Sequence, residues 1–175
     1  MREDVVAALL GAVLGDGPML DVGCGPGAHV RELPGFVVGT DLAPGMLHVA
    51  AEHGASALVQ ADLGRGLPFA DGAFVGALTL LVLQHVPDPP AAVAELRRVL
   101  RRGAPLVLSV PAKEGQLIAR RGLYWRLRAW GARMPGFIHR FSEADVRALL
   151  SAFEIVELRH VGVTYVALVR DPESL

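Results

Sequence analysis

Cysteine is almost absent from this chain of 175 residues, which contains Cys24 and no other. A single thiol excludes an intrachain disulfide and any zinc cluster built from several thiolates. The six histidines show no paired spacing of the kind that metal ligands need, so we predict no bound metal. The fold must therefore be stabilised by its apolar core, for which 52% hydrophobic residues are ample.

The chain also lacks a long apolar run, a basic leader and a large net charge. None of its apolar runs is long and clean enough to span a bilayer, and the first four residues are net acidic where a secretory signal would be basic. The net charge is −1, and the balance of 52% hydrophobic to 20% charged residues excludes disorder. We expect one cytoplasmic domain that covers residues 1–175.

Apolar runs and amphipathic patterns alternate along most of the chain. The runs predict strands over residues 18–22, 36–41, 57–60, 74–83, 105–110, 154–161 and 163–170. The amphipathic patterns predict helices over residues 2–14, 28–33, 44–53, 90–102 and 142–152, the last opened by a capping box of Ser142 and Asp145. This order indicates an α/β fold with a doubly wound, mostly parallel sheet of seven strands, closed by an antiparallel last strand.

The first predicted strand runs directly into a glycine-rich turn, Met-Leu-Asp-Val-Gly-Cys-Gly-Pro-Gly, at residues 19–27. A strand followed by a loop with little side-chain bulk lets a ligand approach the backbone at the carboxyl edge of an open α/β sheet. Asp21 stands two residues before the first glycine, where its carboxylate would repel a phosphate. The loop therefore favours a cationic or hydroxyl-rich ligand.

Aspartates stand at the ends of the first three predicted strands, as Asp21, Asp41 and Asp62. In a doubly wound sheet these strand ends line one crevice. Asp41 is placed to bind ribose hydroxyls, and Asp62 is placed to accept from an exocyclic amine such as adenine N6. The apolar neighbours that would enclose the base are Leu42, Met46 and Leu63.

Ordered motifs along the chain resemble those of class I S-adenosylmethionine-dependent methyltransferases. They are LDVGCGPG at 20–27, GTDLAPGML at 39–47, ADL at 61–63, LPF at 67–69, LQHVPDP at 83–89 and ELRRVLRRG at 95–103. The similarity covers residues 18–111, with a weaker echo at 142–170. It is greatest to the small-molecule branch that includes the ubiquinone and menaquinone biosynthesis methyltransferases, with a type 11 methyltransferase domain. A lone glycine loop would be weak evidence, whereas ordered motifs at domain-like spacing are specific.

The resemblance implies a Rossmann-like methyltransferase fold and S-adenosyl-L-methionine as the cofactor. By this resemblance Gly23, Cys24 and Gly25 would lie against the methionine moiety. Asp21 would accept a hydrogen bond from the ligand ammonium, directly or through water. The backbone near Leu81, past the fourth strand, would face the methionine tail.

The same resemblance assigns the nucleoside end of the cofactor. Asp41 would bind the ribose hydroxyls, and Asp62 would bind adenine N6, although an acid in a surface turn is the structural alternative for Asp62. The remaining cofactor contacts that we expect are Leu42, Met46, Ala61 and Leu63.

Two other functions remain open from the sequence alone. Gly23-x-Gly25-x-x-Ala28 also satisfies the dinucleotide fingerprint, so an NAD-dependent oxidoreductase is a competitor that explains Asp41 but neither Asp21 nor Asp62. A cofactor-binding module without turnover is the other, because the glycine loop arrives after only one predicted helix, where relatives carry more chain. A smaller departure is Val75, which stands where many relatives have an aspartate.

A basic segment at residues 113–140 is the candidate for binding the methyl acceptor. Seven basic residues stand there against Glu114, interleaved with aromatic residues that include both tryptophans. We expect a small acidic or aromatic acceptor. A solvated amphipathic helix and a peripheral membrane contact are the alternatives. We expect no nucleic acid partner, and the sequence does not determine the oligomeric state.

Gln84 and His85 follow the fourth predicted strand, where the active site of the resembled family opens. His85 is the candidate general base, because an imidazole titrates near neutral pH. Methyl transfers often need no dedicated base, so a structural role for His85 is the alternative.

Overall fold

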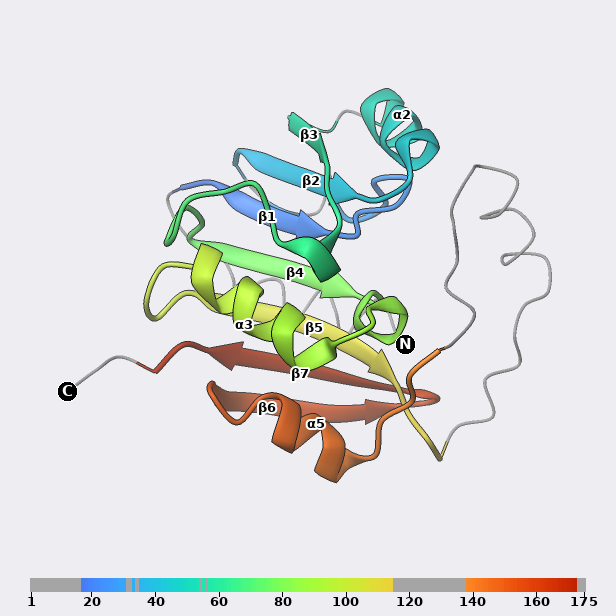
Figure 1. Ribbon diagram of the computed structural model, residues 1–175, viewed down its shortest axis with the longest axis vertical. Helices are drawn as coiled ribbons and strands as arrows, with labels where there is room; N and C mark the ends of the chain where they lie inside the picture. Colours follow the sequence, from blue (N-terminus) through green and yellow to red (C-terminus); the bar gives the residue numbers. More distant parts are fainter. Residues whose placement is uncertain are drawn as a thin grey trace.

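The computed structural model describes residues 17–30, 33, 35–53, 55, 57–114 and 138–172, and Figure 1 shows its arrangement. The strands are β1 Met19–Val22, β2 Val37–Asp41, β3 Ala57–Gln60, β4 Gly76–Leu80, β5 Pro105–Pro111, β6 Glu154–Val161 and β7 Thr164–Arg170. The helices are α2 Pro44–Glu52, α3 Pro89–Val99 and α5 Glu143–Leu149, with short 3₁₀ helices η1 Leu63–Arg65 and η2 Leu83–His85. The predicted helix over residues 2–14 and the interior of the basic segment lie outside the described residues.

All seven strands form one sheet in the order β3-β2-β1-β4-β5-β7-β6. Strands β1 to β5 are parallel to one another, and β7 is antiparallel to both β5 and β6. The predicted doubly wound sheet with an antiparallel last strand is confirmed. Its order reverses beside β1, and ligands of open α/β sheets bind at such a switch point, at the carboxyl ends of the strands.

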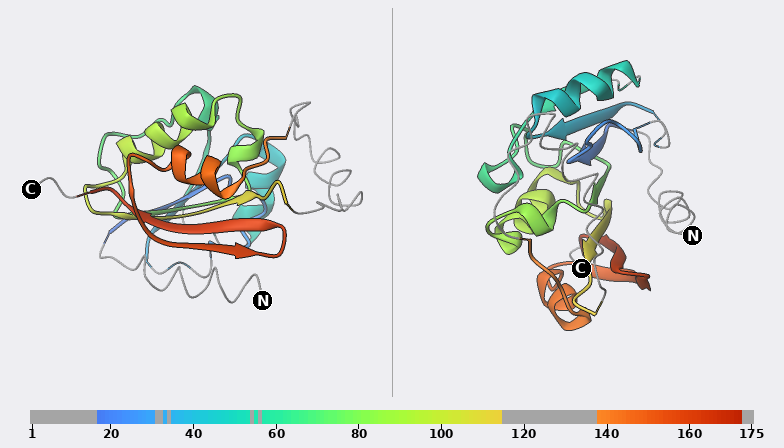
Figure 2. Two further views of the ribbon diagram at one scale, coloured as in Figure 1. Left: turned by 90° about the horizontal axis from the view of Figure 1, so that it is seen from below. Right: turned by 90° about the vertical axis from the view of Figure 1, so that its right-hand side faces the viewer.

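Apolar side chains cover both faces of the central strands, which explains why those strands read as nearly continuous apolar runs. On one face, Leu106 and Leu108 of β5 pack with residues of α3 and α5. On the other face, Val107 packs with Leu78 of β4 and Ala50 of α2. Figure 2 shows α3 and α5 together on one side of the sheet. Alternation along β5 therefore builds two separate core layers.

The connection from β1 to β2 departs from expectation. Residues 25–30 form turns, so the helix predicted over residues 28–33 is absent at 28–30, and residues 31, 32 and 34 are not described. Gly25 and Gly27 have positive φ angles of 54° and 80°. The next strand begins at Val37. Pro34 precedes it by three residues, and a proline disfavours the helical conformation of the residue before it, here Leu33. Turns that contain Gly25 and Gly27 therefore form the described start of the connection between β1 and β2.

The fourth strand is shorter than its apolar run. Strand β4 ends at Leu80, although the run continues to Leu83. Leu81 has a φ of +57°, a left-handed conformation that breaks the pleat. Leu83 then joins η2 and is fully buried. Apolar periodicity predicted burial there correctly, but it could not show that the chain turns.

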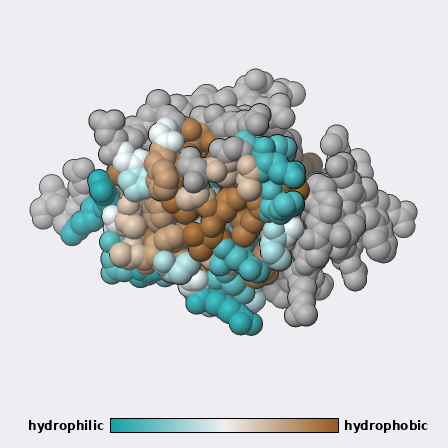
Figure 3. Space-filling view, turned by 90° about the horizontal axis from the view of Figure 1, so that it is seen from above, coloured by the Kyte–Doolittle hydropathy of each residue, from teal (hydrophilic) through white to brown (hydrophobic). Residues whose placement is uncertain are grey.

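The two sheet edges differ in polarity. The β6 edge alternates charged residues with apolar ones and contains a bulge between Ile155 and Glu157. The β3 edge, Ala57–Gln60, has no charged residue. Figure 3, seen from above Figure 1, shows apolar surface gathered in the middle of this side, with hydrophilic residues at its borders. Charges and a bulge blunt an edge strand against pairing, and only β6 has them.

The capping box predicted for the last helix is confirmed. The Asp145 N–H donates to Ser142 Oγ at 3.2 Å, and the Ser142 N–H donates to Asp145 Oδ2 at 2.7 Å. Lys113 Nζ also donates to this carboxylate at 2.6 Å, which ties the stem of the basic segment to α5. The cap therefore serves both the helix and the segment before it.

We expect Ser142→Ala to lower the free energy of unfolding by about 1 kcal/mol, because the Asp145 N–H loses its acceptor and the Asp145 carboxylate loses the Ser142 hydroxyl donor. Urea unfolding followed by circular dichroism measures the change. Ser151→Ala, at an exposed position after α5, is the control and should change stability by less than about 0.5 kcal/mol. Equal effects of the two substitutions would contradict the role of the cap.

Candidate cofactor site

The carboxyl ends of β1, β2 and β3 are joined by backbone hydrogen bonds. The Cys24 N–H donates to the Thr40 carbonyl at 2.9 Å, which ties the glycine loop to β2. The Ala61 N–H donates to the Asp41 carbonyl at 3.1 Å, which ties the end of β3 to the end of β2. The predicted residues of these three strand ends therefore lie along one edge of the sheet.

Asp21 is the most unusual group at this edge. It lies near the carboxyl end of the interior strand β1 and is 3% exposed, and its Oδ2 has no hydrogen-bond partner within the described residues. Burial raises the pKa of Asp21 from 3.8 to about 7, with His29 lowering it and Asp41 raising it. A buried carboxylate oxygen without a donor is costly, and a ligand that brings a cation or a donor removes that cost.

The glycine loop has the conformation and the space that a closely bound ligand needs. Gly23 has a φ of +69°, and a Cβ there would lie 2.2 Å from a methyl group of Val82. The loop thus packs directly on the turn after β4. Gly25 has a φ of +54°, and a Cβ there would meet nothing within 4 Å. Its backbone therefore borders open space, as a ligand cradle requires.

Asp41 holds the glycine loop in place. The Gly25 N–H donates to Asp41 Oδ2 at 3.0 Å, and the Ala43 N–H donates to Asp41 Oδ1 at 2.8 Å. Each carboxylate oxygen still has lone-pair capacity for a further donor, such as a ribose hydroxyl. The side chain is half-buried and therefore reachable. Asp41 has a structural role that the sequence did not reveal, and this role is compatible with the predicted one.

The predicted base-binding residues occupy the next strand end. Asp62 caps η1, because its Oδ1 accepts from the Gly64 N–H at 2.9 Å, while Oδ2 lies 3.4 Å from Arg65 Nε. Leu42 is 49% exposed, whereas Met46 and Leu63 are buried. An exposed leucine above buried apolar residues is a suitable platform for a flat ring. Asp62 therefore also has the structural role that was the alternative for it, because its Oδ1 caps the start of η1.

Cys24 is an inert filler of the loop. Burial, followed by the charges of Asp21 and Asp41, raises the pKa of the Cys24 thiol to about 12. A thiol with so high a pKa is protonated at neutral pH and is neither a nucleophile nor a metal ligand. Its contribution is therefore its small size, since its sulfur would lie 3.0 Å from a Cβ added at Gly39.

The turn after β4 is held by polar groups whose roles were not apparent from the sequence. The Leu81 N–H donates to the Ser109 carbonyl at 3.0 Å, and it lies 3.2 Å from Ser109 Oγ. Gln84 Nε2 donates to the Leu81 carbonyl at 2.7 Å. Gln84 is 6% exposed, although glutamine is normally a surface residue. The one signal in the sequence was a polar residue placed directly after the apolar run that ends at Leu83.

One end of the basic segment contacts this turn, and the two flanks of the segment pair with each other. Ala112 and Phe141 form a parallel bridge, and the His139 N–H donates to the Gln84 carbonyl at 2.9 Å. Residues 115–137 lie outside the described part of the chain. The acceptor role of the segment therefore stays a prediction, although the stem at His139 contacts the turn after β4.

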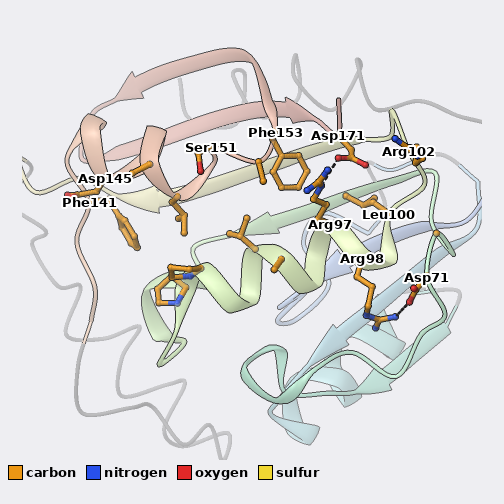
Figure 4. A pocket seen from close by; sticks show the side chains of 18 residues that line it. Asp71, Arg97, Arg98, Leu100, Arg102, Phe141, Asp145, Ser151, Phe153 and Asp171 are labelled. Carbon is orange, nitrogen blue, oxygen red and sulfur yellow. Dashed lines mark hydrogen bonds and ion pairs between the residues drawn. The ribbon is translucent and has the colours of Figure 1, made fainter. Parts of the chain in front are cut away.

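A separate groove of about 1050 Å³ lies between α3 and α5 (Figure 4). None of the residues predicted to bind the cofactor lines it. Its rim contains the ion pairs Arg97–Asp171 and Arg98–Asp71, each at 2.6 Å. The groove is therefore distinct from the strand-end site. No helix within the described residues is long and apolar enough to cross a membrane.

Comparison with known proteins gives consistent similarities. Residues 20–108, about half of the chain, match the methyltransferase domain family. A ubiquinone biosynthesis O-methyltransferase from Xanthomonas oryzae pv. oryzae is 36% identical over 118 residues, which are 62% of this chain and 48% of that protein. An uncharacterised 37.1 kDa protein in transposon Tn4556 from Streptomyces fradiae is 42% identical over 101 residues, 53% of this chain and 29% of that protein. This chain thus spans less than half the length of either relative.

Solved structures share the fold. A S-adenosylmethionine-dependent methyltransferase from Thermotoga maritima, described as a possible histamine N-methyltransferase, superposes with a TM-score of 0.71. The alignment covers 95% of this chain and 87% of that one at 19% identity. At that identity the likeness shows the fold alone.

The raised pKa of Asp21 predicts a pH dependence of stability for the ligand-free protein. Between pH 3.8 and about 7 the folded state retains a proton that the unfolded chain has released, so this group makes stability fall as the pH rises. Asp21→Asn removes the proton. The stability of the variant relative to the parent should therefore grow by up to about 1.4 kcal/mol per pH unit until about pH 7.

Urea unfolding between about pH 5 and pH 8 measures this difference. Thr79→Val, a neutral change at a fully buried residue of β4, is the control and should give a difference that does not vary with pH. A pH-independent effect of Asp21→Asn would show that the Asp21 carboxylate does not titrate in the folded state as described.

Proposed function

This chain belongs to the class I S-adenosylmethionine-dependent methyltransferases, and from that premise we propose that it transfers the methyl group of S-adenosyl-L-methionine to a small-molecule acceptor. The observation that carries the proposal is the unpartnered Oδ2 of the buried Asp21 beside an open glycine loop. The ammonium of the cofactor's methionine moiety is the cation that this oxygen requires.

The residues at the strand ends fit the cofactor from end to end. Asp21, with the backbone of Gly23 and Gly25, would hold the methionine moiety. Asp41 would accept from the ribose hydroxyls, because both of its oxygens keep lone-pair capacity after binding two backbone N–H groups. Asp62 Oδ2 would accept from adenine N6. The contacts to the ring itself would come from Leu42, Met46, Ala61 and Leu63, and Cys24 and the Leu81 backbone would complete the wall beside the methionine moiety.

The contribution of the chain to the chemistry is positioning. When bound, the cofactor supplies an electrophilic methyl group on a sulfonium sulfur. In an in-line displacement the bond from the acceptor to the methyl carbon would form as the sulfur–carbon bond breaks, with the demethylated cofactor as the leaving group. Fixing the two reactants in line and excluding water accounts for most of the acceleration in such a transfer. In this proposal, Asp41 contributes by holding Gly25 and the ribose together.

We propose a small acceptor of acidic or aromatic character. The support is the basic, aromatic composition of residues 113–140 and the contact between a stem of that segment and the turn after β4. The similarity to a ubiquinone biosynthesis O-methyltransferase agrees with an aromatic acceptor. We also propose a cytoplasmic location, where the lone Cys24 would stay a thiol.

A binding module without turnover is the second candidate function. The observations that support it are those of cofactor binding itself, the unpartnered Asp21 Oδ2 and the open glycine loop, because neither requires a methyl acceptor. Such a module would bind both the cofactor and its demethylated product. It would convert no acceptor, whereas an enzyme would release S-adenosylhomocysteine when offered one.

Calorimetry should detect binding of S-adenosylmethionine and S-adenosylhomocysteine to the purified protein and no binding of NAD. The physical reason is that Asp21 attracts the ammonium of the first two ligands and repels the pyrophosphate of the third. A screen of metabolites that follows S-adenosylhomocysteine release then separates the enzyme from the binding module. Binding of NAD alone would refute the proposed function.

We expect Asp41→Ala to weaken S-adenosylhomocysteine binding by about 1.5–3 kcal/mol, roughly 10- to 150-fold, because a charge-assisted hydrogen bond is lost and the Gly25 N–H loses its partner. Calorimetry on both proteins measures the change. Asp71→Ala is the matched control, since Asp71 is 82% exposed and precedes the amino end of β4. Unchanged affinity in Asp41→Ala would remove Asp41 from the ribose site.

A further inference from the structure

The side chain of Gln84 can take only one orientation without conflict. Its Nε2 lies 2.7 Å from the Leu81 carbonyl oxygen, which accepts and cannot donate. Exchanging the amide nitrogen and oxygen would place two acceptors against each other and would leave both amide hydrogens buried without a partner. The Leu81 carbonyl therefore fixes the amide of Gln84.

The fixed amide determines which nitrogen of His85 carries the proton. One hydrogen of Gln84 Nε2 is used on the Leu81 carbonyl, and the other faces His85 Nε2 at 3.3 Å. His85 Nε2 is then the acceptor, so the proton of the neutral ring is on Nδ1, which is buried and has no hydrogen-bond partner within the described residues. Burial lowers the pKa of His85, which keeps the ring neutral at neutral pH. The general-base role assigned from the sequence needs a free lone pair, and the Nε2 lone pair is already used.

The turn after β4 also supports the glycine loop. Leu81 is strained, with a φ of +57°, and bonds to Ser109 and Gln84 hold its N–H and its carbonyl. The next residue, Val82, packs against Gly23, where even a Cβ would not fit. Strain of this kind persists only where neighbouring groups over-determine it. The Gln84 amide is one of those groups.

We propose that Gln84 is a positioning residue, which holds the strained Leu81 against the glycine loop and fixes His85 as a neutral Nδ1–H imidazole that does not act as the base. The proposal deepens the proposed function and rests on it only for the identity of the cofactor. It implies that the acceptor reacts as an anion or a neutral lone pair, or loses its proton to water, without transferring it to His85.

The tautomer of His85 is measurable without an acceptor. Long-range ¹⁵N–¹H spectra of ¹⁵N-labelled protein at about pH 8 distinguish the two neutral tautomers, since the protonated and unprotonated nitrogens have different shifts. His85→Asn identifies the signal. We expect the Nδ1–H form, and a signal of the Nε2–H form would overturn the proposal.

Two variants test the link to Gln84. Gln84→Met keeps the length of the side chain but cannot donate, so the His85 signal should shift toward the Nε2–H form, and S-adenosylhomocysteine affinity should fall about fivefold or more. Gln84→Glu can only accept and should shift the signal in the same direction. Thr79→Val, also a buried polar residue and close in the chain, is the control and should change neither readout. An unchanged tautomer in Gln84→Met would overturn the proposal.

The outcomes separate this inference from the proposed function. The tautomer of the parent protein is read directly, so the test stands even where a variant does not fold. Normal binding of S-adenosylhomocysteine with an Nε2–H imidazole would refute only the role of Gln84. An Nδ1–H imidazole in a protein that binds no S-adenosylhomocysteine would refute only the proposed function.

Discussion

The position of β1 inside the sheet, where the strand order reverses, constrains the rest of this molecule. It lies between β2 and β4, both parallel to it, and all four of its residues are buried. Because its carboxyl end meets those of its neighbours, whatever follows it faces the switch point of the sheet. The chain must turn there at once, and Gly23 makes that turn with a conformation that other residues rarely adopt. The loop, Asp41 and the turn after β4 all pack around this one point.

Asp21 shows how such a site differs from the surrounding core. Elsewhere in the sheet, the buried side chains are almost all apolar. A carboxylate in that setting loses stability unless it is protonated or finds a partner, and its raised pKa expresses this cost. Local rules of stability are broken at functional sites, where a ligand supplies the missing partner. The same argument applies to Gln84, whose Oε1 is buried and has no partner within the described residues.

The strained turn after β4 contacts both the glycine loop and one end of the basic segment. Leu81 leaves the strand in a left-handed conformation, and this places Val82 on the glycine loop and brings Gln84 back toward the Leu81 carbonyl. The stem of the basic segment reaches the same turn through His139. A change in this turn therefore acts on the glycine loop and on one end of the basic segment together. That coupling follows from contact, since each step is a direct hydrogen bond or packing contact.

Much of this protein is determined by its sequence alone, because the signals are local. Strands β3 and β6 begin and end at the predicted residues, the capping box of Ser142 and Asp145 forms as expected, and the glycine loop with its three strand-end aspartates identified the family. Only the tertiary structure showed that turns replace the start of the helix after Gly27, that β4 ends at Leu80, and that the amide of Gln84 is fixed. These features depend on residues distant in the chain, such as Ser109 against Leu81 and Val82 against Gly23. The periodicity of apolar residues shows which side chains are buried. Which polar groups form hydrogen bonds with each other is decided only by the packing of the folded chain.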